Sequence, residues 1–199
     1  AAKSHPGPIP GARWDAGIYP EDEKVIDYRE FVASKLAMRP PSGLTGDRAL
    51  PDSLFHHQSA LVRWALRRGR CAIFADTGLG KSRMEVAWAD VVARETGRPV
   101  LILAPLAVAP QTVAEGESLG VDVTLCRDGV DIRPGVNITN YDRLHRFDPS
   151  IFGGVVLDES SVIKHADTKT FSRLTDAFRF TPFRLAATAT PAPNDWTEL

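Results

Sequence analysis

The segment ADTGLGKS, residues 75–82, has the residue types that bind a phosphate group. A phosphate loop needs small residues that let backbone N–H groups approach, a lysine for the β and γ phosphates, and a hydroxyl for Mg²⁺. Ala75 stands where the usual pattern has glycine, a small departure because alanine adds only a methyl group. The segment therefore predicts a site for ATP or GTP. The residues expected to bind the nucleotide are Thr77, Gly78, Leu79, Gly80, Lys81 and Ser82.

A second stretch, GGVVLDESS, places an acidic pair after an apolar run. Ligands of open α/β sheets bind at the carboxyl ends of the strands, and there Asp158 and Glu159 would lie. Asp158 would hold Mg²⁺ through water, and Glu159 would orient and deprotonate an attacking water. Taken alone, such a pair is equally typical of a solvated strand end. Together with the phosphate loop and the later AATATP, it predicts a hydrolytic nucleotide site.

The elements that position these residues follow from the apolar pattern. Short β-rich runs alternate with helical segments, which predicts an α/β domain with a largely parallel sheet. Between the first two strands, apolar residues recur at helical spacing from Met84 to Val92, and Gly97 stands where a helix would end. The predicted strands are 71–75, 99–104, 121–126, 136–139, 154–158 and 183–187.

The first 50 residues differ from the rest because prolines interrupt them repeatedly. We interpret residues 1–50 as an extension and residues 51–199 as the nucleotide-binding domain. Within the extension, the stretch EKVIDYREFVASKLAM favours one short helix that packs on the main body.

The composition of the chain says more about its cellular compartment and its partners than about its activity. The formal net charge of -1 gives no overall attraction to a polyanion, so nucleic acid would have to bind a local patch. Cys71 and Cys126 have no partner at metal-ligand spacing and are expected to be reduced core thiols. No apolar run reaches the roughly 20 residues of a membrane span, and the start lacks a secretion signal. We expect a cytoplasmic protein, in a prokaryotic or viral setting, with no membrane partner.

From Leu54 to Asn194 the chain resembles the helicase superfamily two ATPases, and in detail their chromatin-remodeller-like translocase branch. LFHHQ is similar to the adenine-reading segment and ADTGLGKS to motif I. LILAPLAVAPQTVAE is similar to motif Ia, ITNYDRL to motif Ib, LDESSVIKH to motif II and RLAATATPAPN to motif III. The resemblance implies the first of two RecA-like lobes, with ATP and Mg²⁺ as cofactors.

The resemblance also implies roles for further residues. Gln58 would contact adenine, and Thr188 and Thr190 would couple the nucleotide site to movement. A nucleic-acid surface, most simply for double-stranded DNA, would comprise Pro105, Leu106, Thr139, Asn140 and Tyr141. The alternative for Tyr141 is a ring packed under a loop.

Departures from the family pattern leave other functions open. Ser160 and Ser161 replace the residues that name the better-known members, and the chain ends at Leu199, just past motif III. The resemblance therefore implies a second lobe, C-terminal to this chain, that supplies an arginine finger, and we expect this lobe alone to be nearly inactive. The alternatives are a P-loop NTPase of another class acting on protein, and a nucleotide- or DNA-binding module without activity of its own.

Overall fold

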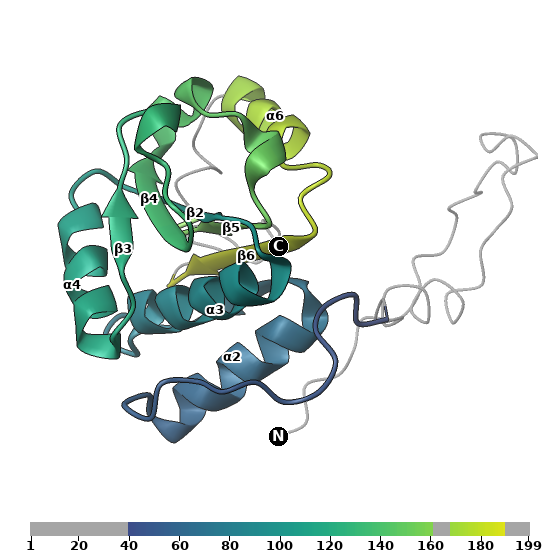
Figure 1. The fold of residues 1–199 in the computed structure, drawn as a ribbon, viewed down its shortest axis with the longest axis vertical. Helices are drawn as coiled ribbons and strands as arrows, with labels where there is room; N and C mark the ends of the chain where they lie inside the picture. Colours follow the sequence, from purple (N-terminus) through teal and green to yellow (C-terminus); the bar gives the residue numbers. More distant parts are fainter. Residues whose placement is uncertain (1–39, 161–167, 190–199) are drawn as a thin grey trace, which may run out of the picture. The chain divides into compact units, whose positions relative to one another are not determined.

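The computed structural model describes residues 40–160 and 168–189, and these residues form a six-stranded sheet in which every strand pair is parallel. The strand order is β1-β6-β5-β2-β4-β3 (Figure 1). The predicted α/β RecA-like fold class with a parallel sheet is confirmed. The strands are β1 (Arg70–Phe74), β2 (Val100–Ala104), β3 (Val123–Leu125), β4 (Val136–Asn140), β5 (Gly154–Leu157) and β6 (Phe183–Thr188).

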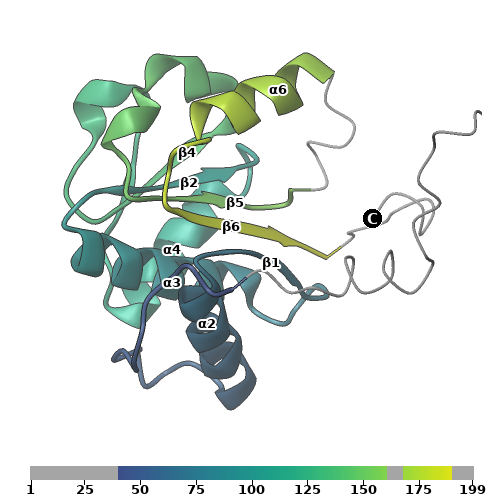
Figure 2. The same cartoon turned by 90° about the vertical axis from the view of Figure 1, so that its right-hand side faces the viewer.

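Helices cover both faces of the sheet, as Figure 2 shows. One face carries α2 (His56–Arg68), α3 (Lys81–Thr96) and α4 (Ala109–Leu119), and the other carries α6 (Thr168–Ala177). Three short 3₁₀ segments complete the described chain: η1 (Gly129–Asp131), η2 (Tyr141–Arg146) and η3 (Pro149–Ile151). Among the described residues, no helix is both long enough and apolar enough to cross a membrane.

The alternation of side chains along the central strands divides the core in two. In β2, Val100, Ile102 and Ala104 pack in the cluster beneath α2, α3 and α4. Leu101 and Leu103 point the other way, into the cluster that contains Leu174 and Phe178. Successive side chains of a strand face opposite sides of the sheet, so a strand covered on both faces must be apolar throughout. This explains why the central strands β2 and β5 were readable as continuous apolar runs.

The central helix α3 ends where the sequence predicted. Gly97 is its C-cap, with a left-handed φ of 64°, and its N–H donates to the Ala93 carbonyl. The apolar stripe from Met84 to Val92 is buried against the sheet, and the Trp88 ring meets Phe183 of β6 edge-on at 6.4 Å between centroids. Each predicted strand lies within two residues of an observed strand.

The segment 40–50 packs against the end of α2. The N–H groups of Ser42, Gly43 and Leu44 donate to carbonyls at the end of α2. A Cβ on Gly43 would overlap the Leu66 carbonyl oxygen, so the close approach of the two backbones requires glycine. The compact unit begins at Pro40, earlier than the predicted boundary at residue 51, because these backbone contacts hold the segment. The predicted N-terminal helix lies outside the described residues.

Candidate functional site

The predicted phosphate loop is a tight turn between β1 and the first residue of α3. Gly78 and Gly80 have left-handed φ angles of 84° and 74°, which glycine adopts without steric cost. The Lys81 ammonium donates to the carbonyls of Ala75, at 3.0 Å, and Asp76, at 3.4 Å, so it lies folded over the loop. Ser82 follows in the first turn of α3. The turn thus places a lysine, a hydroxyl and a helix N-terminus together, which is the arrangement that binds phosphate.

Gln58 joins helix α2 to this loop. Its Oε1 accepts the Phe55 N–H at 3.0 Å, and its Nε2 donates to the Leu79 carbonyl at 3.1 Å. The side chain is buried, and a Cβ on Gly80 would overlap its Nε2. Gln58 therefore caps α2 and holds the phosphate loop, and its predicted contact with adenine stays a prediction.

Phe55 is a residue near this site that the sequence analysis missed. Its ring is 66% exposed and stacks on His57, with 5.9 Å between centroids and 14° between ring planes. A large aromatic side chain left exposed beside a polar site is more informative than an exposed aliphatic one. Its position three residues before Gln58 was the signal that could have identified it.

Arg83 ties the start of α3 to two neighbouring segments. Its guanidinium donates to Glu115 Oε2 at 3.1 Å and to Ser118 Oγ at 2.8 Å, both on α4. It also donates to the carbonyl and hydroxyl of Ser53, each at 3.2 Å, in the segment that precedes α2. Arg83 is thus engaged in structural contacts.

The acidic pair lies at the carboxyl end of β5. The Asp158 N–H donates to the Leu103 carbonyl at 2.9 Å, which extends the ladder to β2. Glu159 adopts a φ of 49°, the only positive φ of a non-glycine residue among those described. Such a conformation is costly, and its presence at a strand end is typical of a functional site.

Thr188 at the end of β6 meets this pair. Its Oγ1 donates to Glu159 Oε1 at 3.0 Å, so the neighbouring strands β5 and β6 bring the two predicted residues together. The backbone also joins them, because the Ser160 N–H donates to the Ala187 carbonyl at 2.9 Å. Thr190, the other predicted coupling residue, lies outside the described part of the chain.

Glu85 is a third acid in the site, and the sequence analysis did not identify it. It projects from α3 one turn after Lys81 and is fully buried. Burial raises the pKa of Glu85 well above its usual value, and the charge of Asp158 raises it further. Burial also raises the pKa of Asp158. The i, i+4 spacing from Lys81 was the available signal.

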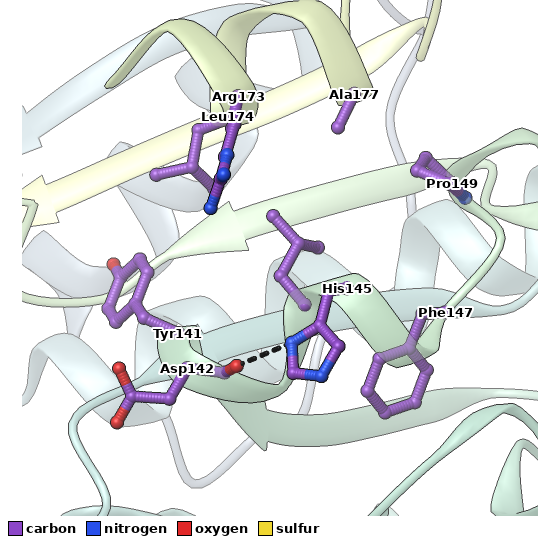
Figure 3. A pocket seen from close by; sticks show the side chains of 9 residues that line it. Tyr141, Asp142, His145, Phe147, Pro149, Arg173, Leu174 and Ala177 are labelled. Carbon is purple, nitrogen blue, oxygen red and sulfur yellow. Dashed lines mark hydrogen bonds between the residues drawn. The ribbon is translucent and has the colours of Figure 1, made fainter. Parts of the chain in front are cut away.

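Tyr141 packs beneath the acidic pair. Its hydroxyl donates to the Asp158 carbonyl at 2.7 Å, and burial, followed by the charge of Asp158, raises the pKa of the phenol. The ring lies at one end of a cavity of about 450 Å³ between η2 and α6, with Phe147 and Pro149 at the other end (Figure 3). This position agrees with the alternative in which the Tyr141 ring packs under a loop, although the residue is only partly buried.

The other residues predicted to touch nucleic acid differ in exposure. Pro105 and Leu106 follow β2, and Leu106 is 64% exposed. Asn140 ends β4 beside them, paired in register with Ala104. Thr139 is fully buried, and its hydroxyl donates to the Cys126 carbonyl at 2.9 Å. Its side chain therefore faces the core and not the surface, and its predicted contact with nucleic acid stays a prediction.

The donor set fits a magnesium ion that arrives with a nucleotide. Mg²⁺ usually keeps several waters and binds one or two protein oxygens together with substrate phosphates. Within residues 40–160 and 168–189, no group of three His, Cys, Asp or Glu side chains could hold a metal ion alone. Ser82 and Asp158 offer one hydroxyl and one carboxylate, and Asp158 lies close enough to Lys81 for their charges to interact. The site is thus suited to a metal bridging phosphate and protein.

Comparison with solved structures places this fold among helicase domains. The UvsW helicase from bacteriophage T4 superposes with a TM-score of 0.62 at 15% identity, covering 88% of this chain and 64% of that one. The Sulfolobus solfataricus SWI2/SNF2 ATPase core in complex with dsDNA superposes with a TM-score of 0.63 at 22% identity, covering 81% of this chain and 36% of that one. The Pyrococcus furiosus Hef helicase domain superposes with a TM-score of 0.59 at 17% identity, covering 71% of this chain and 34% of that one. These likenesses show the fold.

The chain spans between about a third and just under two thirds of the length of these three structures. No protein-family model matches the sequence, and no curated protein matches it either. The residues of the site, and not sequence similarity, must therefore support any statement about activity.

Proposed function

We propose that this chain is the N-terminal ATP-binding lobe of an ATP-dependent helicase or translocase of superfamily two, in the chromatin-remodeller-like branch. One observation carries the proposal. The phosphate loop, the acidic pair and Thr188 lie at the carboxyl ends of three neighbouring strands, β1, β5 and β6, and are therefore close together. Neighbouring parallel strands that each end in a functional residue are the arrangement expected of a nucleotide hydrolase.

In this proposal the loop binds the phosphates of ATP through its N–H groups. Lys81 exchanges its contacts with the loop carbonyls for the β and γ phosphates. Gln58 retains one N–H and one lone pair beyond its two contacts, which is the set needed to read an adenine edge. The exposed ring of Phe55 offers a stacking surface for the base.

For hydrolysis, Ser82 and Asp158 would hold Mg²⁺, which supplies charge neutralisation at the phosphates when bound. Glu159 orients the attacking water and accepts its proton. Its hydrogen bond with Thr188 links this base to the segment that leads onward to a proposed second lobe. Because that lobe would supply an arginine worth about 10³ to 10⁵ in rate, this chain alone should be nearly inactive.

The proposed nucleic-acid surface lies on the loops after β2 and β4, around Pro105, Leu106 and Asn140. We propose double-stranded DNA as the partner, acting inside a prokaryotic or virus-infected cell. The support is that one similar structure is an ATPase core in complex with dsDNA, and another, LlaGI, is in complex with a DNA substrate mimic. Hydroxyls and backbone N–H groups on such loops can hold phosphates without reading bases, as movement along any sequence requires.

The test is nucleotide binding by the 199-residue chain, measured by calorimetry with a non-hydrolysable ATP analogue and Mg²⁺. Lys81→Ala removes a charge-assisted contact worth about 1.5 to 3 kcal/mol, so the affinity should fall at least about tenfold. Arg94→Ala, at the far end of the same helix, is the matched control and should bind normally. Equal affinity in the Lys81→Ala variant and the unmodified chain would refute the site.

A further inference from the structure

Arginines gather at the amino ends of the strands, at the edge of the sheet opposite the candidate nucleotide site. Strands β2 and β4 are parallel and paired from their first residues, so the segments that lead into them lie side by side. A cavity of about 530 Å³ at this edge is lined by Arg94 and Arg98, from the end of α3 and the turn after it, and by Arg133, from the loop before β4. Among the described residues that line this cavity, the only acid is Asp90, and it pairs with Arg94 at 2.9 Å. Arg98 and Arg133 have no acidic partner within the described chain.

The chain holds these two guanidinium groups in place. Arg98 donates to the carbonyls of Ser150 and Ile151 in η3, and Arg133 donates to two carbonyls of its own loop, each at 3.0 Å. That loop is held in turn by the buried side chain of Asn137, which accepts the Arg133 N–H at 2.9 Å and donates to the Arg133 carbonyl at 2.8 Å. Each guanidinium keeps further N–H groups for a ligand. Because the two groups are already ordered, an anion that binds them loses less side-chain entropy.

A second cavity extends this surface to an exposed aromatic ring. It has a volume of about 440 Å³, and Arg98 and Phe180 both line it. The Phe180 side chain is 87% exposed, and the Arg179 guanidinium lies 5.7 Å from its ring centroid. Asp148 lines the cavity too, but its carboxylate accepts the Ser150 N–H at 2.9 Å. A phenyl ring left in water beside arginines offers a surface on which another flat ring can stack.

These features fit a polyanion that also carries flat rings. Phosphates bind guanidinium groups through charge-assisted hydrogen bonds, and nucleobases stack on aromatic side chains without regard to sequence. The bases of a duplex are already stacked on one another, so an exposed ring favours a single strand. Arginines near the end of α3 also stabilise the helix dipole, but that role does not explain Arg133, which lies on another segment, or Phe180.

We propose that the amino-end surface, formed by Arg98, Arg133, Arg179 and Phe180, binds single-stranded nucleic acid. Arg98 and Arg133 contact phosphates, and one base stacks on Phe180. The inference goes beyond the proposed function, because this surface lies at the opposite edge of the sheet from the loops proposed for double-stranded DNA and shares no residue with the nucleotide site. In a motor that moves on DNA, it would hold a separated strand away from the duplex.

The experiment measures binding of the 199-residue chain to a fluorescently labelled oligothymidylate of about 16 nucleotides, by anisotropy, between about 50 and 200 mM NaCl. The slope of log K against log salt changes by about 0.7 for each phosphate that the protein neutralises on a single strand. Arg98→Gln combined with Arg133→Gln should therefore make the slope shallower by about 1.4. Arg98→Lys combined with Arg133→Lys keeps both charges and should retain the slope.

The matched control is Arg48→Gln combined with Arg63→Gln. It changes the net charge by the same amount, but these arginines already pair with Glu95 and Asp47. The control should leave the slope unchanged. An unchanged slope in the Arg98 and Arg133 glutamine variant, or an equal change in the control, overturns the proposal. Thermal unfolding should show that all these variants are folded, because the replaced side chains lie at the surface.

Phe180→Ala supplies an independent readout, because it removes the stacking ring and no charge. Its affinity for the oligothymidylate should fall at least about fivefold at every salt concentration, with the slope unchanged. Its affinity for a duplex of the same length should stay within about twofold. Unchanged binding of the single strand by Phe180→Ala overturns the proposal, and equally tight binding of polyglutamate would then identify an acidic protein segment as the partner.

Two further results separate this inference from the proposed function. If the unmodified chain does not bind the oligothymidylate at about 50 mM NaCl, the amino-end surface does not bind single strands, whatever the nucleotide site does. Lys81→Ala should bind the oligothymidylate as the unmodified chain does, because Lys81 lies in the phosphate loop. Normal ATP affinity in Lys81→Ala would refute the proposed nucleotide site and leave the amino-end surface standing.

Discussion

Replacing Gly80 with alanine tests how the phosphate loop and Gln58 fit together. Two separate effects act at this position. The φ of 74° is strained for any residue with a Cβ, and the added methyl group would overlap Gln58 Nε2. The amide lies at the end of a flexible side chain, but it is 2% exposed and bonded at both ends, so it can move only by giving up its hydrogen bonds.

The expected cost follows from these contacts. A left-handed backbone costs alanine about 1 kcal/mol or slightly more. Displacing Gln58 removes its bonds with the Phe55 N–H and the Leu79 carbonyl, each worth about 1 kcal/mol. The free energy of unfolding should therefore fall by about 3 kcal/mol, which lowers the melting temperature by about 6 to 12 °C in a domain of this size.

The assay is urea denaturation of the chain, with Gly97→Ala as the matched control. Gly97 has a similar φ of 64°, but a Cβ there would meet nothing within 4 Å. The control should lose only about 1 kcal/mol, the backbone cost alone. In a Gln58→Ala background, Gly80→Ala should also cost only about 1 kcal/mol, because the obstructing amide is gone. Equal losses in Gly80→Ala and Gly97→Ala would refute the placement of Gln58 against the loop.

Three further predictions concern chemistry, packing and pH. In a protein extended to include the proposed second lobe, Glu159→Gln should reduce ATP hydrolysis by about 10² or more while binding persists, and retained turnover would remove its role as base. Arg83→Ala should lower the free energy of unfolding by about 1 to 3 kcal/mol, since it removes the bonds from α3 to α4 and to the segment before α2. Arg94→Ala removes an i, i+4 surface pair with Asp90 and a long 3.5 Å bond to the Ala49 carbonyl, so it should change the free energy of unfolding by about 0.5 kcal/mol or less. Similar losses in both variants would contradict the role of Arg83. Burial raises the pKa of the Cys71 and Cys126 thiols from 9.0 to about 11, so the folded chain keeps both thiols protonated to a higher pH than the unfolded chain does. The free energy of unfolding should therefore fall as the pH rises from about 9 to 11. Denaturation curves that show no such fall would contradict the burial of these thiols.

The sequence was sufficient for the central strands β2 and β5 because they are covered on both faces and are therefore apolar along their length. It did not reveal the order β1-β6-β5-β2-β4-β3, since adjacency depends on contacts between segments far apart in the chain. The segment 40–50 was assigned to the extension because prolines interrupt its pattern. Its attachment depends on backbone hydrogen bonds and on the missing Cβ of Gly43, which composition does not report.

For the candidate site too, local motifs predicted some residues, whereas others depend on the fold. Lys81, Asp158 and Glu159 were predicted because each belongs to a local motif at the end of a strand. The inward position of the Thr139 side chain, which donates to the Cys126 carbonyl, follows from the alternation of β4, and a motif alone does not record which face a strand residue occupies. Glu85 was missed because it lies within an apolar helical stripe, where one acid is easily interpreted as a solvated residue.

The contacts around Asp158 connect the nucleotide site to the proposed nucleic-acid surface. Its N–H donates to the carbonyl of Leu103 on β2, the strand that leads into Pro105 and Leu106. Its carbonyl accepts the hydroxyl of Tyr141, which directly follows β4. The backbone of the proposed metal-binding residue is therefore fixed from both segments that would touch DNA. A displacement of Tyr141 on binding would reach the Asp158 carbonyl through this one hydrogen bond.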